Sequence, residues 1–178
     1  MRKSSFPPIA DERTRLLVLG SLPGEKSLEA RQYYANPTNQ FWRLMEVVIE
    51  AGLVSLDYDR RLARLLSAGV GLWDVIADAE RAGSLDSRIR NHRPNQFVKL
   101  ASSLPAVRGL AFNGGTTSRL GRKLVGPSSC FALFDLPSSS AAYCSISFAQ
   151  KAQRWKSLRE FLAAPCDGVT AMPDSTVS

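Results

Sequence analysis

Four short apolar runs, each ending at turn-forming residues, constrain the fold of this chain more than any other feature. They cover residues 15–20, 68–76, 107–113 and 129–136. Each run has the length and the apolar content of a strand that is buried on both faces. Segments with helical patterning separate the runs, which predicts an α/β fold with a parallel sheet and helices on both of its faces.

Five segments show the apolar spacing or the end signals of helices: residues 39–49, 62–66, 94–103, 116–124 and 147–162. Phe41 and Trp42 lie on the inner face of the first of these helices, so we expect them in the core. The charged stretch 81–93 also contains Gly, Ser and Asn, which predicts a loop. We expect three parts along the chain: a polar lead-in at 1–14, a single domain at 15–164, and a weakly packed polar tail at 165–178.

The composition is that of a basic globular protein with a sizeable core. Of 178 residues, 44% are hydrophobic, and 23 Lys and Arg against 16 Asp and Glu leave a net charge of +7. A basic surface is expected of a protein that binds nucleic acid, although many basic proteins bind none. No apolar stretch reaches the roughly 18 residues that span a bilayer, and the N-terminus lacks the apolar core of a signal peptide. We therefore expect a cytoplasmic protein with no membrane partner.

Several patterns that resemble other functional sites do not hold up. Cys130, Cys144 and Cys166 are too few for a site built from cysteines alone, so we expect free thiols, mostly buried. The single histidine, His92, lies near no Ser, Cys or Asp in a hydrolase order and is interpreted as a surface residue or a phosphate contact. The segment 20–27 looks like a phosphate-binding loop, but its glycines are too close and a glutamate precedes its lysine. We expect no metal and no other cofactor.

The carboxyl ends of the expected strands carry polar and turn-forming residues: 20–24, Asp74, 113–115 and 137–140. Because the carboxyl ends of parallel strands lie at one edge of a sheet, these residues should converge on one crevice. The loop after the first strand adds Tyr33 and Tyr34 beside Asn36 and Asn39. Aromatic faces stack on bases, and amides read base edges or hold a water. The combination indicates a pocket for a nucleobase rather than for a simple anion.

These residues resemble motifs of the uracil-DNA glycosylase superfamily. The first match runs from Gly20-Ser-Leu-Pro-Gly24 through Tyr33-Tyr34-Ala-Asn36-Pro37-Thr-Asn39-Gln-Phe41-Trp42, and later matches include 71–75, 83–87, 112–114 and 136–140. The likeness is greatest to the hypoxanthine-DNA glycosylase branch, with similarity also to mismatch-specific uracil glycosylases. It covers about residues 15–160 in one order. The resemblance implies a three-layer α/β/α fold with a central four-stranded parallel sheet, and a monofunctional base-excision enzyme without a metal.

The resemblance also implies roles for the first motif. Many superfamily members carry a water-activating Asp or Asn where this chain has Leu22, a side chain that cannot polarise water. The branch that it resembles relies instead on the Asn of the Pro-x-Asn-x-Phe-Trp segment, which is Asn39 here, and this residue is expected to orient the water. Backbone N–H groups at Ser21, Leu22 and Gly24 are expected to contact the departing base.

Three further side chains are candidates for binding the base, each with an alternative. Tyr34 could stack on a flipped base or pack against the next helix. Asp74 occupies the position of the superfamily's base-reading residue, usually an Asn, and could hydrogen-bond the base or cap a turn. Asn113 could read the base or fasten the Gly114 turn, and the turn role is favoured.

The serine-rich turn and nearby cations are candidates for binding DNA. Ser138, Ser139 and Ser140 resemble a loop that grips phosphates, or they form an ordinary turn, and a residue in 141–143 could fill the gap left by a flipped base. The superfamily's usual His near this turn is absent. Lys26 and Arg119 are candidates for contact with phosphates, although for each one taken singly a solvated charge is the favoured interpretation.

The sequence therefore predicts a DNA glycosylase that removes a deaminated base and leaves an abasic site. Uracil is the first choice of base and hypoxanthine a close second. The expected partner is single- or double-stranded DNA, and the expected state is a monomer. Two alternatives remain open: a non-catalytic binder of damaged or abasic DNA with the same fold, and an unrelated small-molecule enzyme that is merely basic.

Overall fold

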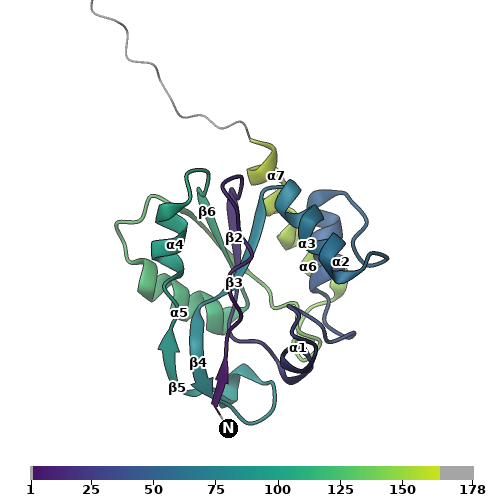
Figure 1. The fold of residues 1–178 in the computed structure, drawn as a ribbon. Coiled ribbons are helices and arrows are strands. Elements are labelled where there is room, and N and C mark those ends of the chain that lie inside the picture. The colour runs from purple at the N-terminus through teal and green to yellow at the C-terminus, as the bar shows by residue number, and fades with distance from the viewer. Residues whose placement is uncertain (1, 165–178) are drawn as a thin grey trace, which may run out of the picture.

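The computed structural model describes residues 2–164, which contain two β-sheets (Figure 1). The main sheet is parallel, with strand order β3-β2-β6-β7, and its strands are β2 (Leu16–Gly20), β3 (Val70–Asp74), β6 (Gly109–Asn113) and β7 (Ala132–Leu136). The smaller sheet is antiparallel, with order β1-β4-β5, and its strands are β1 (Arg2–Ser4), β4 (Ile76–Glu80) and β5 (Arg90–Pro94). The main sheet confirms the four predicted strands.

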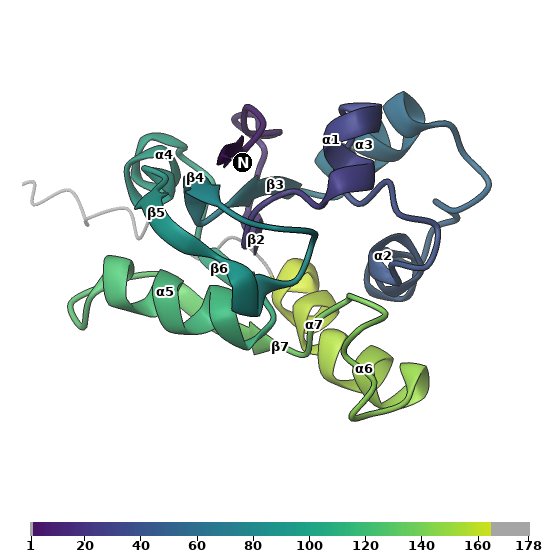
Figure 2. The ribbon, with the colours of Figure 1, turned by 90° about the horizontal axis from the view of Figure 1, so that it is seen from below.

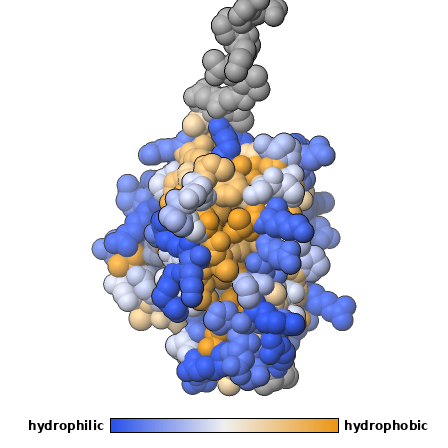
Figure 3. Space-filling view, turned by 90° about the vertical axis from the view of Figure 1, so that its left-hand side faces the viewer, coloured by the Kyte–Doolittle hydropathy of each residue, from blue (hydrophilic) through white to orange (hydrophobic). Residues whose placement is uncertain are grey.

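Helices cover both faces of the main sheet, as the alternation of elements predicts. Within residues 2–164 the α-helices are α1 (Glu25–Ala30), α2 (Phe41–Ile49), α3 (Tyr58–Ser67), α4 (Phe97–Ser103), α5 (Gly115–Val125), α6 (Phe148–Trp155) and α7 (Ser157–Ala163). Helices α4 and α5 lie on one side of the sheet, and α2, α3, α6 and α7 lie on the other (Figure 2). The surface on the side of α4 and α5 shows an apolar strip bordered by hydrophilic side chains (Figure 3).

Strand β2 forms the centre of this layered core. All five of its residues are buried. Leu16 and Val18 pack into the core cluster under α2, α6 and α7, whereas Leu17 and Leu19 pack into the cluster under α4 and α5. Because successive side chains of a strand point to opposite faces, one apolar run supplies both cores. This explains why the run is continuously apolar rather than alternating.

The strand register brings the carboxyl ends of the main sheet to one edge. Gly20 pairs with Asp74 across β2 and β3, and Asn113 pairs with Leu136 across β6 and β7. The amino ends are also aligned, because Leu16 lies opposite both Val70 and Gly109. The loops that leave these strands therefore begin side by side.

The N-terminal segment is more than a surface lead-in, and the expected loop at 81–93 is only partly a loop. Strand β1 pairs with β4, and β4 pairs with β5. Ile9 bridges to Leu72, and the indole of Trp73 donates a hydrogen bond to the carbonyl of Phe6 at 2.9 Å. The side chains of β5 are all exposed, so the strand has no apolar periodicity, and backbone pairing alone reveals it.

Other boundaries also differ from the prediction. Pro94 ends β5, so α4 begins at Phe97. The expected helix at 147–162 is divided into α6 and α7 at Lys156. Cys130 and Cys144 are free, as predicted, but both are exposed rather than buried. Cys166 and the expected tail lie outside the described residues. Within 2–164, no helix has the length and apolar character needed to cross a membrane.

Candidate active site

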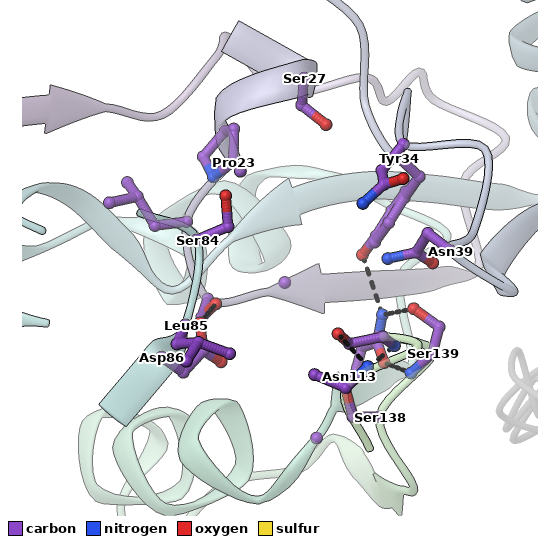
Figure 4. A pocket seen from close by; sticks show the side chains of 18 of the residues that line it. Pro23, Ser27, Tyr34, Asn39, Ser84, Leu85, Asp86, Asn113, Ser138 and Ser139 are labelled. Atoms are coloured by element: carbon purple, nitrogen blue, oxygen red, sulfur yellow. Dashed lines mark hydrogen bonds between the residues drawn. The ribbon is translucent and has the colours of Figure 1, made fainter. Parts of the chain in front are cut away.

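A cleft of about 470 Å³ opens at the carboxyl edge of the main sheet. Its walls come from the loop after β2, the end of β3, the segment between β4 and β5, the start of α5, and the turn after β7 (Figure 4). The volume lies within the usual range for small-molecule sites. Every predicted site residue lines this cleft except Arg119, which lines an adjoining hollow. The strand ends thus converge on one cleft, as predicted, while the roles of the residues remain predictions.

Tyr34 packs against the helix that follows it. Its ring lies face to face with Phe41 in the first turn of α2, with centroids 3.7 Å apart and planes 9° from parallel. Its hydroxyl accepts a hydrogen bond from Nδ2 of Asn113 at 3.2 Å. Burial raises the pKa of the Tyr34 phenol, so the group stays protonated at neutral pH. The packing alternative is therefore observed, and stacking on a base remains a prediction for a ring that also lines the cleft.

Asn39 lies at the entry to α2 with its amide held in place. Its Oδ1 accepts a hydrogen bond from the backbone N–H of Phe41 at 2.9 Å. The backbone N–H of the next residue, Gln40, donates to the carbonyl of Ser139 at 2.9 Å, which ties this corner to the serine-rich turn. An amide oxygen has two lone pairs, so the contact with Phe41 leaves capacity to accept from a water. The geometry fixes the direction of the Asn39 side chain at the wall of the cleft.

Asn113 fastens the serine-rich turn, in agreement with the favoured interpretation of this residue. Its Oδ1 accepts from the backbone N–H of Ser139 at 2.8 Å, and its Nδ2 donates to Oγ of Ser139 at 2.8 Å. Both residues are buried. With Tyr34 as its third contact, the Asn113 amide links the end of β6 to two walls of the cleft.

The three serines of the turn differ in what their side chains can reach. Ser139 is 1% exposed and its hydroxyl is used inside the protein, so its predicted contact with DNA would need the turn to open. Ser138 and Ser140 are partly exposed and line the cleft. Gly114, with φ of +103°, lies against Ser138, and a Cβ there would come within 3.1 Å of the Ser138 Cβ. Glycine is needed at this position for both reasons.

Asp74 is a buried carboxyl group at the end of β3. Its Oδ2 accepts a hydrogen bond from Oγ of Ser5 at 2.7 Å. A Cβ placed on Gly20 would lie 2.6 Å from its Oδ1, so the neighbouring strand has room only for glycine. Burial raises the pKa of Asp74 to about 7, while the Ser5 hydroxyl and the nearby Arg81 charge oppose the rise. Both protonation states of this cleft residue are therefore populated near neutral pH.

Asp86 is a second carboxyl group of the cleft, and it was not among the predicted site residues. It begins a short 3-10 helix (Asp86–Arg88), and its Oδ1 accepts a hydrogen bond from Oγ of Ser21 at 2.6 Å. The same oxygen lies 3.8 Å from Nη1 of Arg81. The only sequence signal for it was its place in the 83–87 match. Ser21 and Asp86 are 65 residues apart in the chain, so the fold brings them together and no local spacing could reveal the pair.

Arg81 stabilises the loop after β2 by hydrogen bonds to its backbone. Its side chain is fully buried and donates to the carbonyls of Leu22, at 3.1 Å, and Pro23. The Leu22 side chain is 6% exposed and belongs to the core, so this position meets the cleft mainly through its backbone. Gly24 and the exposed Lys26 continue the same wall.

Most of the chain matches a known protein family. The family model described as the uracil DNA glycosylase superfamily matches residues 7–160. This chain belongs to the uracil-DNA glycosylase superfamily. It is 43% identical over 114 residues to the hypoxanthine DNA glycosylase of Methanosarcina barkeri, which covers 64% of this chain and 72% of the relative. The hypoxanthine DNA glycosylase of Methanosarcina acetivorans is 42% identical over the same shares.

A solved structure supports the same family fold. The solution NMR structure of a protein provisionally described as a uracil DNA glycosylase, from Methanosarcina acetivorans, superimposes with a TM-score of 0.79 at 36% identity. It covers 90% of this chain, and 98% of that chain is covered in return. The superfamily fold places this chain among the DNA glycosylases, whose substrate is DNA.

Proposed function

We propose that this superfamily member is a monofunctional glycosylase that excises a deaminated base from DNA, hypoxanthine before uracil, and leaves an abasic site. The observation that carries the proposal is the cleft at the strand ends, where Asn39, Tyr34 and Asp74 meet. The names of the two relatives favour hypoxanthine, which reverses the order expected from the sequence alone.

The reaction sets the tasks of the cleft. Water adds to C1′ of the deoxyribose, the glycosidic C–N bond breaks, and the base leaves with the bonding electron pair and takes up a proton. A base inside a duplex cannot reach an enclosed site, so the nucleotide must be flipped out of the stack. The protein must hold the base, position the water and favour the charges that develop.

Asn39 is the residue proposed to orient the water. Its neutral amide cannot remove a proton strongly, but its oxygen can accept a hydrogen bond from the water. The contact between Oδ1 and the Phe41 N–H fixes the orientation of this oxygen before substrate binds. A fixed acceptor lowers the entropic cost of placing the attacking water.

The base is proposed to lie between Tyr34 and Asp74. Tyr34 offers an aromatic ring that its contacts with Phe41 and Asn113 hold rigidly. Asp74 can donate a hydrogen bond when protonated and accept one when charged, and its pKa of about 7 makes both forms available. A proton on Asp74 also lessens the repulsion that a carboxylate would exert on a departing anionic base.

The DNA backbone is proposed to cross the serine-rich turn. Ser138 and Ser140 offer hydroxyl groups at the rim, while the buried Ser139 keeps the turn in shape. Lys26 is an exposed cation that lines the cleft, and Arg119 is an exposed cation that lines the adjoining hollow. Contacts of this kind position DNA without reading its sequence.

A cleavage assay tests the proposal. Labelled oligonucleotides carry one hypoxanthine or one uracil, single-stranded or duplex, and alkali reveals abasic sites. We expect the wild type to cleave hypoxanthine substrates, and Asn39→Ala to lose at least roughly a hundredfold in rate with DNA affinity kept. Gln153→Ala, an exposed amide on α6, is the matched control and should cleave normally.

Other outcomes of the assay have defined meanings. Cleavage of uracil alone would restore the order expected from the sequence. Cleavage of neither base with retained DNA binding would favour the non-catalytic alternative, for which the buried Leu22 in place of a water-activating residue is the supporting observation. Unchanged cleavage by Asn39→Ala would exclude its proposed role.

A further inference from the structure

Asp86 faces the cleft from the wall opposite Asn39 and Tyr34. In Figure 4, Asp86 and Leu85 lie on one side of the cleft, and Tyr34, Asn39, Asn113 and Ser139 lie on the other. A base held between these walls would present one edge to Asp86. Asp86 has no role in the proposed reaction steps, although it lines the cleft in which the base is proposed to lie.

The segment that precedes Asp86 is held by contacts with two other parts of the chain, the start of α1 and strand β1. Oγ of Ser84 accepts a hydrogen bond from the backbone N–H of Glu25 at 3.0 Å. Lys3, which is 3% exposed, donates to the carbonyl of Gly83 at 2.6 Å. These contacts fix the backbone on the N-terminal side of Asp86, and the hydrogen bond from Ser21 orients its carboxylate.

One oxygen of the carboxylate is used and the other is available. Oδ1 accepts from Ser21 and faces Arg81, whereas Oδ2 has no hydrogen-bond partner among residues 2–164. Burial raises the pKa of Asp86, and the Ser21 hydroxyl and the Arg81 guanidinium oppose that rise by favouring the charged form. A charged carboxylate only accepts hydrogen bonds. In its charged form, with Oδ1 held by Ser21 and facing Arg81, Asp86 offers Oδ2 to the cleft as an acceptor.

Deamination changes the property that such an acceptor can detect. In adenine and cytosine, the ring nitrogen beside the amino-bearing carbon carries no hydrogen and is an acceptor. Deamination replaces the amino group by a carbonyl group and places a hydrogen on that nitrogen, which gives N1–H in hypoxanthine and N3–H in uracil. A fixed carboxylate can accept from this N–H, but it would meet a second lone pair in the parent base. Such a mismatch leaves a buried polar group unpaired, which is costly.

We propose that Asp86 is a specificity-determining residue that accepts a hydrogen bond from the ring N–H created by deamination, so that the parent base is rejected. The inference rests on the proposed function, because it assumes a base in this cleft. Asp74 fits the same task less well: each carboxyl group has one oxygen bonded to a serine, but Asp74 is buried, whereas the Asp86 side chain is 37% exposed. Asp86 is therefore the better placed of the two to accept a hydrogen bond from the edge of a base.

Binding of uncleavable substrates tests this role. Duplexes carry a 2′-fluoro analogue of deoxyinosine, deoxyadenosine or deoxynebularine, whose base lacks the N1–H, and the dissociation constants are measured by fluorescence anisotropy. For the wild type we expect a preference of roughly tenfold or more for inosine over either other base. Asp86→Asn should bring this preference below roughly threefold, because an amide can turn to offer either a donor or an acceptor. Asp59→Asn, on the exposed face of α3, should leave it unchanged.

The outcomes separate this inference from the proposed function. A wild type without any preference for inosine, or an Asp86→Asn variant that weakens all three duplexes by the same factor, would overturn the inference and leave Asp86 a structural anchor. Thermal unfolding of each variant shows whether the fold is kept, and the comparison among the three duplexes stays valid for any folded fraction. Excision of unmodified hypoxanthine by the wild type is measured in parallel. Its absence would refute the proposed function, whereas excision with unchanged selectivity in Asp86→Asn would refute the inference alone.

Discussion

Replacing Asn113 by alanine should loosen the serine-rich turn and lower the stability of the whole domain. The side chain makes hydrogen bonds to the backbone N–H of Ser139 and to its Oγ, both at 2.8 Å, and to the hydroxyl of Tyr34 at 3.2 Å. Each bond contributes roughly 0.5–1.5 kcal/mol, and the buried N–H of Ser139 would lose its acceptor, so we expect a loss of about 2–4 kcal/mol in unfolding free energy. With an m-value typical of small domains, the urea midpoint should fall by about 1–2 M.

Urea unfolding followed by tryptophan fluorescence measures this loss, and a double-mutant cycle locates it. Ser139→Ala removes one hydroxyl and should cost less than Asn113→Ala. The double variant should cost less than the sum of the two, because the residues share a hydrogen bond. A loss below about 1 kcal/mol for Asn113→Ala would refute the reasoning. It would show that other contacts hold the turn, such as the bond from the Trp155 indole to the Pro137 carbonyl at 3.0 Å.

Two further predictions concern the floor of the cleft. Gly20→Ala should reduce hypoxanthine excision at least roughly tenfold, because the new Cβ would lie 2.6 Å from Oδ1 of Asp74 and 3.2 Å from the Tyr34 hydroxyl; steady-state kinetics would contradict this if kcat/KM stayed normal in a folded variant. The second prediction concerns Asp74, whose pKa is about 7 in the folded protein against an ordinary value of 3.8. Between about pH 4 and pH 7 the folded protein therefore holds a proton on Asp74 that the unfolded chain has lost. The contribution of Asp74 to the free energy of unfolding falls as the pH rises through this range. Asp74→Asn should remove this pH dependence. In urea titrations, the unfolding free energy of the variant minus that of the wild type should therefore increase between pH 5 and pH 8. A difference that stays constant with pH would count against the raised pKa.

The local pattern of the sequence contained enough information for the main sheet. A strand such as 16–20 has no polar face, so it can be buried only between two apolar layers. The turn-forming residues that follow it end the strand. Parallel strands then bring Gly20, Asp74 and Asn113 to one edge whatever the details of packing. The cleft was predictable for this reason.

The smaller sheet was not predictable in the same way. Strand β5 exposes every side chain, and its pairing with β4 depends on backbone hydrogen bonds and on ion pairs such as that of Arg93 with Asp78. A charged edge strand has no hydrophobic period that a sequence pattern could reveal. Strand β1 was not predicted from the sequence, because it is defined by its backbone pairing with β4, which lies far from it in the chain.

The sequence by itself determined the layered α/β core, the edge at which the site forms and the residue types available there, because these follow from hydrophobic periodicity and turn chemistry along neighbouring residues. Only the tertiary structure decided how those residues are used. It directed Ser139 inward to hydrogen-bond with Asn113, brought Ser5 to Asp74, and brought Ser21 to Asp86 at one wall of the cleft. Hydrogen bonds between residues far apart in the chain depend on distance and direction in space, which local patterns do not encode.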